Sequence, residues 1–238
     1  MKKVCLLSTF FLFGLISCGQ KINLGNVVNS VLSGAPLSEA EIGEGLKEAL
    51  SVGINLGADK ASALDGYLKN PKIRIPFPPE VQKVETTLRS IGLGGEVDKF
   101  ILALNRGAEN AAQQAKPIFI SAIKQLTIRD AISILRGEKD AATQFLKRTT
   151  STQLIQAFEP YMLKSLENTQ ATKYYTDIAN VYNKVPFVTK INPDLKGYAT
   201  HRAVDGLFVL VAEEEAKIRE NPLARTSELL KRVFGSNN

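Results

Sequence analysis

Helix-start signals recur along this chain, and each one precedes apolar residues at the spacing of one helix face. Ser38 and Glu41 form a capping box ahead of an apolar four-residue repeat that begins at Ile42. Thr127 and Asp130 repeat this pattern further along the chain. Because few residues separate successive patterns, neighbouring helices should pack antiparallel. The sequence therefore predicts an all-α fold, a single domain of multiple short-to-medium antiparallel helices.

Cap residues and apolar stripes together indicate where each helix begins and ends. The segments expected to be helical are 38–54, 79–91, 97–115, 117–126, 127–137, 141–148, 150–166, 169–184, 198–221 and 226–235. Asp140 is the expected cap of the helix at 141–148. Thr150 and Gln153 form a further capping box, so the residues after Thr150 are expected to start a separate helix.

The stretch near residues 72–77 has the alternation of a strand rather than the spacing of a helix. Ile73, Ile75 and Phe77 occupy alternate positions, with Pro76 between the last two. Proline cannot donate a hydrogen bond to a neighbouring strand, which confines it to sheet edges. We therefore expect at most one short extended β segment near 72–77.

The amino-terminal end carries an export signal. Lys2 and Lys3 precede an apolar run, Val4–Ser17, that is shorter than the about 20 residues of a membrane-spanning helix. A positive start followed by a brief apolar core and small residues is typical of a secretory signal peptide. The run ends in Leu15–Cys18, which resembles the lipoprotein box of bacteria: a branched apolar residue stands three places before the cysteine and a small residue just before it.

The resemblance to bacterial lipoproteins implies that Cys18 becomes the first residue and carries three acyl chains. Three chains form a stable anchor, since each buried methylene contributes about 0.8 kcal/mol and a single chain binds only marginally. Gly19 stands where aspartate usually retains a lipoprotein in the inner membrane, and residues 20–23 lack an acidic surface-export run. We expect a lipid anchor at the periplasmic face of the outer membrane. The expected division is a signal peptide at 1–17, a lipidated tether at 18–36 and a helical domain at 37–235.

Cysteine and histidine usage excludes several kinds of site. Cys5 leaves with the signal peptide, Cys18 is lipidated and His201 is the single histidine. A mature chain without a free thiol forms no disulfide, no thiolate nucleophile and no cysteine-based zinc site. We therefore expect no cofactor and no metal site, and any metal would have to be a hard cation bound by oxygen atoms.

The charge pattern indicates which classes of partner to expect. The formal net charge of +6 includes Lys2 and Lys3, which leave with the signal peptide, and the remaining charges are spread along the chain. Without a dense basic run interleaved with aromatic residues, nucleic acid is not an expected partner. A mild basic excess suits a protein held near anionic lipid headgroups. The expected partner is the membrane, bound through Cys18, with an envelope protein or an apolar ligand as further candidates.

Several separated clusters in the helical region match, in order, the pattern of one bacterial family. They are Lys116-Pro117-Ile118-Phe119, Asp130-Ala131, Asp140-Ala141-Ala142-Thr143, Gly206-Leu207-Phe208, Glu213-Glu214-Glu215, Ile218-Arg219, Asn221-Pro222 and Arg225-Thr226. The chain resembles the family catalogued as domain of unknown function 4197 over about residues 37–235. This resemblance implies a helical periplasmic domain, and it supplies no established catalytic residue.

One member of an acidic triplet faces the core on a helical wheel. Glu215 falls inside an apolar stripe, whereas Glu213 points to the opposite side and Glu214 lies at the margin. A buried carboxylate needs a cation or hydrogen-bond donors, and Arg219 and Arg225 follow closely. We predict that Glu215 is buried and bonded to an arginine, either as an ion pair that fixes the last helix or as a functional carboxylate in a pocket. The stripe consists of Val204, Leu207, Phe208, Val211 and Ile218.

Five further residues complete the possible ligand or ion-pair site. Asp130, Asp140 and Thr143 could act as oxygen ligands or as an acid–base set, or they could cap helix starts. Lys116 and Arg148 could bind an anion, or they could be solvated residues on helix faces. No catalytic residue is assigned.

Two functions fit these observations. The first is a non-enzymatic, outer-membrane-anchored lipoprotein with a binding or structural role. The second is a carboxylate-based hydrolase acting on envelope glycan, with two facing acids among Asp130, Asp140, Glu214 and Glu215. Two carboxyl groups about 5–10 Å apart across an open cleft would favour the hydrolase. Carboxylates closed against arginines would favour the binding protein, which is the function we expect.

Overall fold

The computed structural model describes residues 37–79, 82–90, 92–167 and 194–235, together with 173, 175–177, 180, 183–184, 186 and 190. The predicted signal peptide, the tether and Cys18 lie outside the described residues. So does most of the segment from 169 to 193, which includes the helix expected at 169–184.

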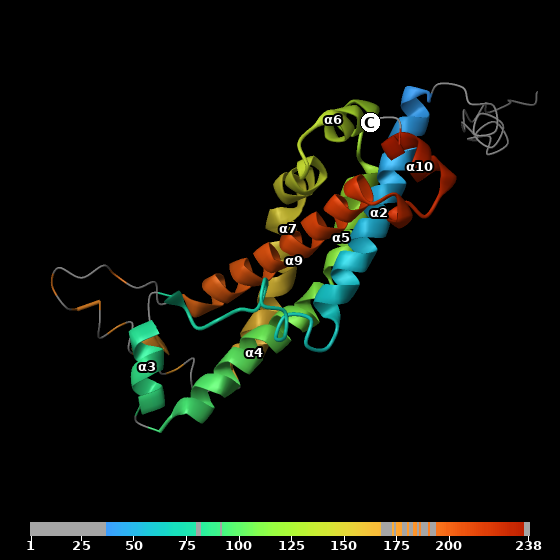
Figure 1. Ribbon diagram of the computed structural model, residues 1–238. Helices are drawn as coiled ribbons and strands as arrows, with labels where there is room; N and C mark the ends of the chain where they lie inside the picture. Colours follow the sequence, from blue (N-terminus) through green and yellow to red (C-terminus); the bar gives the residue numbers. More distant parts are fainter. Residues whose placement is uncertain are drawn as a thin grey trace, which may run out of the picture. The chain divides into compact units, whose positions relative to one another are not determined.

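The described part of the chain is all-α, which confirms the predicted fold class (Figure 1). It contains helices and one short 3-10 turn, η2, without a strand. The elements are α2 (Glu39–Ser62), α3 (Gln82–Ser90), α4 (Gly94–Ala112), α5 (Ala115–Lys124), α6 (Ile128–Arg136), α7 (Ala141–Glu167), α9 (Leu195–Glu220), η2 (Pro222–Ala224) and α10 (Glu228–Gly235).

Successive long helices run in opposite directions (Figure 1). Helix α2 runs one way, α4 and its continuation α5 return, α7 runs back again, and α9 returns beside α2 and α7. The expected antiparallel arrangement is confirmed. Two helices are longer than expected, because α2 and α7 contain 24 and 27 residues. Among the described residues, no helix is both long and apolar enough to cross a membrane.

Close helix packing depends on glycines of α2 that would weaken an isolated helix. A Cβ atom at Gly45 would lie 2.7 Å from Cγ2 of Val233, so the absent side chain lets α10 dock on α2. A Cβ atom at Gly57 would lie 3.4 Å from the backbone nitrogen of Val211, where α9 crosses. The glycines therefore mark the two faces by which α2 contacts α9 and α10.

The predicted caps account for several helix starts. Ser38 accepts from the backbone N–H of Glu41 and the Glu41 carboxylate accepts from the Ser38 N–H, which completes the capping box of α2. Thr127 and Asp130 form the same box at α6. Ser227 accepts a hydrogen bond from a first-turn N–H of α10. Local sequence therefore determines where these helices begin.

The predicted helix boundary at Thr150 is wrong. Residues 141–148 and 150–166 belong to one continuous helix, α7. Thr150 is 1% exposed, and its hydroxyl donates to the carbonyl of Leu146 at 2.6 Å. The hydroxyl is thus satisfied within the helix, one turn back, rather than capping a new one.

The short β segment near 72–77 is not formed. Ile73, Ile75 and Phe77 are buried as strand alternation suggests, but no neighbouring strand pairs with them in the described chain. The backbone of Ile75 instead pairs with the side-chain amide of Asn105, whose Oδ1 accepts at 2.9 Å and whose Nδ2 donates at 2.9 Å. One buried amide on α4 replaces the ladder that a strand would need.

Candidate functional site

The carboxylate of Glu215 connects α9 to the first turn of α7, and we call this contact the Glu215 joint. Its carboxylate accepts hydrogen bonds from the backbone N–H groups of Ala142 at 3.0 Å and Thr143 at 2.8 Å, and from the Thr143 hydroxyl at 2.8 Å. These backbone N–H groups belong to the second and third residues of α7, which a capping residue normally satisfies. A carboxylate from a distant helix therefore caps α7, and its charge complements the dipole there.

This arrangement replaces the role expected for Asp140. Asp140 precedes α7 as predicted, but its carboxylate accepts from the side-chain amide of Gln144 at 2.8 Å. Because Glu215 occupies both backbone N–H groups, a local cap is not required. Thr143 was predicted as a site residue, and it serves as a donor to Glu215.

Arg219 links Glu215 to α6. Its Nε donates to Glu215 at 2.9 Å, and its terminal nitrogens donate to the carbonyls of Ile134 at 2.9 Å and Leu135 at 3.4 Å. The side chains of Glu215 and Arg219 are 7% and 15% exposed. The pair therefore satisfies the last carbonyls of α6 and the first amides of α7 from one turn of α9, which fixes the α6–α7 turn against the core.

Arg225 is buried but does not reach Glu215. It donates to the backbone carbonyls of Ile218 at 3.1 Å and Arg219 at 2.8 Å, at the end of α9. It thus holds the chain reversal at η2, which leads into α10. Of the two arginines expected near Glu215, one binds the carboxylate and the other binds backbone.

Glu214 is buried as well, so the prediction that a single member of the triplet turns inward is wrong. Its carboxylate is bonded to Lys217 at 2.7 Å and to Lys60 of α2. Burial raises the pKa of Glu214, but the hydrogen bonds from Lys217 and Lys60 outweigh this effect and hold the pKa below its ordinary value. The wheel could not include Lys60, which reaches Glu214 because α2 packs against α9.

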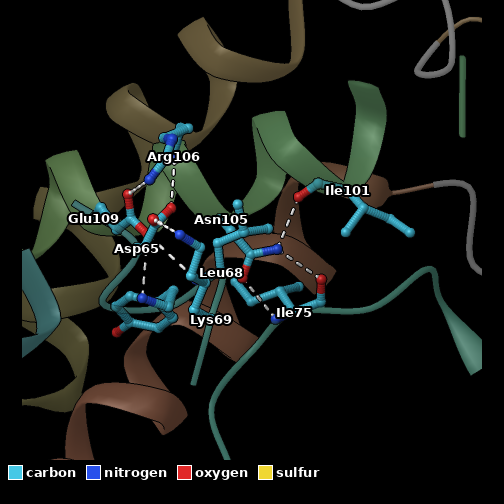
Figure 2. Close-up of polar contacts among 9 residues, drawn as sticks. Asp65, Leu68, Lys69, Ile75, Ile101, Asn105, Arg106 and Glu109 are labelled. Carbon is cyan, nitrogen blue, oxygen red and sulfur yellow. Dashed lines mark hydrogen bonds and ion pairs between the residues drawn. The ribbon is translucent and has the colours of Figure 1, made fainter. Parts of the chain in front are cut away.

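A second buried carboxylate, Glu109, was not predicted (Figure 2). It lies on α4, is 4% exposed, and accepts from the backbone N–H groups of Tyr67 and Leu68 at 3.2 Å each. Arg106, one turn earlier, donates to Glu109 and also to Asp65 at 2.7 Å. Figure 2 shows these side chains converging on the loop that follows α2. The cluster ties residues 63–79 to α4.

The start of this loop is a strained turn. Asp65 has φ of +67°, in the left-handed region that non-glycine residues seldom adopt. Hydrogen bonds from Lys69 and Arg106 hold the turn and lower the pKa of Asp65. Tyr67 is fully buried, donates to the carbonyl of Ala203 at 2.6 Å, and has a pKa raised by burial and by the nearby Glu109. The loop is thereby fixed to α9 as well.

The sequence carried a signal for this cluster. Ile101, Asn105 and Glu109 recur every four residues on α4, so the two polar residues lie on the same stripe as the buried Leu104 and Ala108. Polar side chains on an apolar face need partners, and a neighbouring loop rich in proline offers unpaired backbone groups.

The predicted residues Asp130, Asp140 and Arg148 line one open groove of about 340 Å³ between α6 and α7. The Asp130 carboxylate is engaged with Thr127, whose hydroxyl donates at 2.6 Å and whose backbone N–H donates at 3.1 Å, and these hydrogen bonds lower the pKa of Asp130. The Arg148 guanidinium lies 5.6 Å from the centre of the Phe145 ring. Asp130 and Asp140 thus each accept a hydrogen bond from a residue close in sequence, Thr127 and Gln144 respectively.

The remaining predicted residue, Lys116, is separate from this groove. It pairs with Asp59 of α2 at 2.6 Å on the surface. The predicted set therefore divides into the Glu215 joint, the α6–α7 groove, and Lys116 and Arg225 on their own. Within the described ranges, no three His, Cys, Asp or Glu side chains gather in a way that could hold a metal ion.

A small apolar cavity adjoins the Glu215 joint. Its volume is about 20 Å³, which is space for about one water molecule. Its walls come mainly from α2, α9 and α10, and include Leu46, Leu50, Val211, Ile218 and Phe234. The carboxylate of Glu215 and the guanidinium of Arg219 stand at its edge with their hydrogen bonds directed to α6 and α7. The carboxylate and the guanidinium are therefore mostly buried, and their hydrogen bonds are made to groups of the fold.

Comparison with known proteins places the chain in one family. The model of the family described as protein of unknown function (DUF4197) matches residues 36–235. No curated protein and no solved structure gives a significant match. The match covers all the described helices, including the joint at Glu215 and the cluster at Glu109. The chain belongs to the DUF4197 family.

Proposed function

We propose that this protein is a lipoprotein anchored at the periplasmic face of the outer membrane, where it binds a partner without catalysing a reaction. The alternative was a hydrolase with two free carboxylates facing each other. What supports the binding protein is the state of the four acids that a hydrolase would use. Each of them is engaged by groups of the fold.

Glu215 is bonded to two backbone N–H groups, a hydroxyl and Arg219, and Glu214 is bonded to two lysines. A general acid or nucleophile must reach a substrate. Glu215 could do so only by breaking the α6–α7–α9 joint, and Glu214 only by breaking its ion pairs with Lys60 and Lys217. Asp130 and Asp140 line the open groove, and one carboxylate oxygen of each accepts hydrogen bonds, from Thr127 and from Gln144 respectively. The arrangement favours a structural role for all four acids.

The anchor is supported by the pattern at Leu15–Cys18 and by the short apolar run before it. In cells fed an alkyne analogue of palmitate, we expect the wild-type chain to be labelled and to sediment with outer membranes. Cys18→Ser should lose both the label and membrane association. Cys5→Ser is the matched control, because it removes the other cysteine of the chain and leaves Cys18 in place.

A Cys18→Ser chain that is still labelled and still sediments with outer membranes would overturn the anchor. The binding role is tested separately, by purifying the detergent-solubilised full chain after crosslinking in intact cells. We expect a defined envelope component to accompany the wild type. Recovery of the full chain alone, together with a hydrolytic activity lost in Asp130→Asn, would overturn the non-enzymatic role.

A further inference from the structure

An open groove near the far end of α7 from the Glu215 joint has a different chemistry from the other grooves. It measures about 550 Å³ and lies between α4 and α7, which run antiparallel beside each other (Figure 1). This volume falls within the about 300–1,000 Å³ of typical ligand sites. Six residues line it: Asn110, Gln113, Pro160, Tyr161, Lys164 and Ser165.

Both walls of the groove contain irregular helix. Gln113 stands at the break between α4 and α5, where the N–H of Gln114 donates to the carbonyl of Ala111 at 2.9 Å in a tighter turn. Pro160 lies inside α7 and has no N–H to donate to the carbonyl one turn before it. Proline within a long helix normally weakens it by about 3 kcal/mol or more.

The two helices are in close contact at one end of this groove. A Cβ atom at Gly107 would lie 3.0 Å from Cβ of Ser165 and 3.2 Å from the sulfur of Met162. Asn110 follows Gly107 by one turn of α4, and Tyr161 precedes Ser165 by about one turn of α7. The Tyr161 ring is half-buried and packs against the core, so its position is fixed by the fold.

The lining is rich in neutral polar groups and contains no carboxylate. Asn110 and Gln113 are exposed amides, each offering donors and an acceptor, and Tyr161 and Ser165 add hydroxyls. Lys164 is the single charged residue of this lining. By contrast, Glu44 and Glu48 line the groove between α2, α5 and α10, and Asp130, Glu138 and Asp140 line the α6–α7 groove.

We propose that the α4–α7 groove binds a glycan chain. Sugars present alternating donors and acceptors, which amides match on both counts, and acetamido groups pair with amides in the same way. A fixed aromatic ring with a polar edge suits the mixed apolar and polar faces of a pyranose. This inference rests on the proposed binding role, and it names the class of ligand.

The test is isothermal titration of the full chain, purified in detergent, with the tetramer of β-1,4-linked N-acetylglucosamine. We expect saturable binding to the wild type. Asn110→Ala/Gln113→Ala should weaken it about tenfold or more, because the amides that bond the sugar are lost. Both residues are exposed and alanine favours helix, so the double variant should fold normally.

The matched control is Gln125→Ala/Gln144→Ala, which removes two exposed amides outside this groove, one of them in the α6–α7 groove. It should bind the sugar as the wild type does. Absence of saturable binding, or equal affinity in wild type and Asn110→Ala/Gln113→Ala, would overturn the glycan site. Mass spectrometry of the sugar after titration separates the two claims, because cleavage would contradict the non-enzymatic role and leave the binding site standing.

Discussion

Removing the Glu215 carboxylate should destabilise the protein far more than removing the carboxylate of Glu213, the most exposed member of the acidic triplet. Glu215→Ala leaves two backbone N–H groups, the Thr143 hydroxyl and the Arg219 guanidinium without the acceptor they share at 2.8–3.0 Å. The side chain of Arg219 is 15% exposed, so water cannot fully replace the lost partner. Breaking a buried ion pair by deleting one partner costs about 3–5 kcal/mol.

The matched control is Glu213→Ala, because Glu213 lies on the same helix two positions before Glu215. The Glu213 side chain is 29% exposed and pairs with Lys72, which is 67% exposed. Surface pairs of this kind contribute about 0–1 kcal/mol. Urea unfolding followed by far-UV circular dichroism measures both free energies of unfolding. At about 2–4 °C per kcal/mol, Glu215→Ala should also lower the melting temperature by about 6–20 °C. Equal, small effects of the two substitutions would refute the capping role of Glu215.

Three further predictions follow from the described contacts. On acidification from about pH 6 to about pH 3, the free energy of unfolding of the wild type should fall more steeply than that of Glu214→Gln, as measured by urea unfolding. The folded protein lowers the pKa of Glu214, so this carboxylate contributes stability above its ordinary pKa of 4.5. That contribution is lost as the pH falls through the pKa of the folded state. Parallel curves would contradict it. Glu109→Ala should accelerate trypsin cleavage at Lys69, Lys72 or Arg74, since Tyr67 and Leu68 lose their acceptor. Glu44→Ala, at an exposed position outside this loop, should leave cleavage unchanged. Unaltered cleavage of Glu109→Ala would argue against its role in holding the loop. Finally, the melting temperature should be insensitive to reductant and to zinc chelators, and a marked fall with either would show that a thiol or metal contributes to the fold.

Helix positions were predictable because caps and apolar stripes are local. Ser38 and Thr127 begin α2 and α6 through partners three residues away, and the sequence contains all the groups involved. Thr150 misled the prediction for a related reason. Its hydroxyl has two local options, a cap or a bond one turn back, and burial of α7 against α4 and α9 selects the second.

The cap of α7 could not be assigned from local sequence. Asp140 is the natural choice there, but Glu215 takes the two N–H groups from 72 or more residues away. The wheel correctly turned Glu215 toward the core, and it failed for Glu214 because Lys60 lies on another helix. Where a polar group finds its partner across the fold, a single helix pattern indicates burial but not the partner.

The same limit explains the missing strand. Alternation at Ile73, Ile75 and Phe77 reports that these side chains are buried, and they are. The alternation does not indicate which groups form hydrogen bonds with the backbone of this segment. Asn105, on a helix, does so with one side-chain amide. Burial pattern and hydrogen-bond partner are separate properties, and the first is far easier to infer.

The central claim, that the protein binds in the envelope without cleaving what it binds, can be measured with purified cell-wall sacculi. The full chain would be incubated with sacculi, and the soluble fraction analysed for released sugar and peptide fragments. We predict that the protein sediments with the sacculi and releases no more fragments than the heat-denatured protein does. Release of fragments that disappears in Asp130→Asn or Asp140→Asn would contradict the claim and establish the α6–α7 groove as a catalytic site.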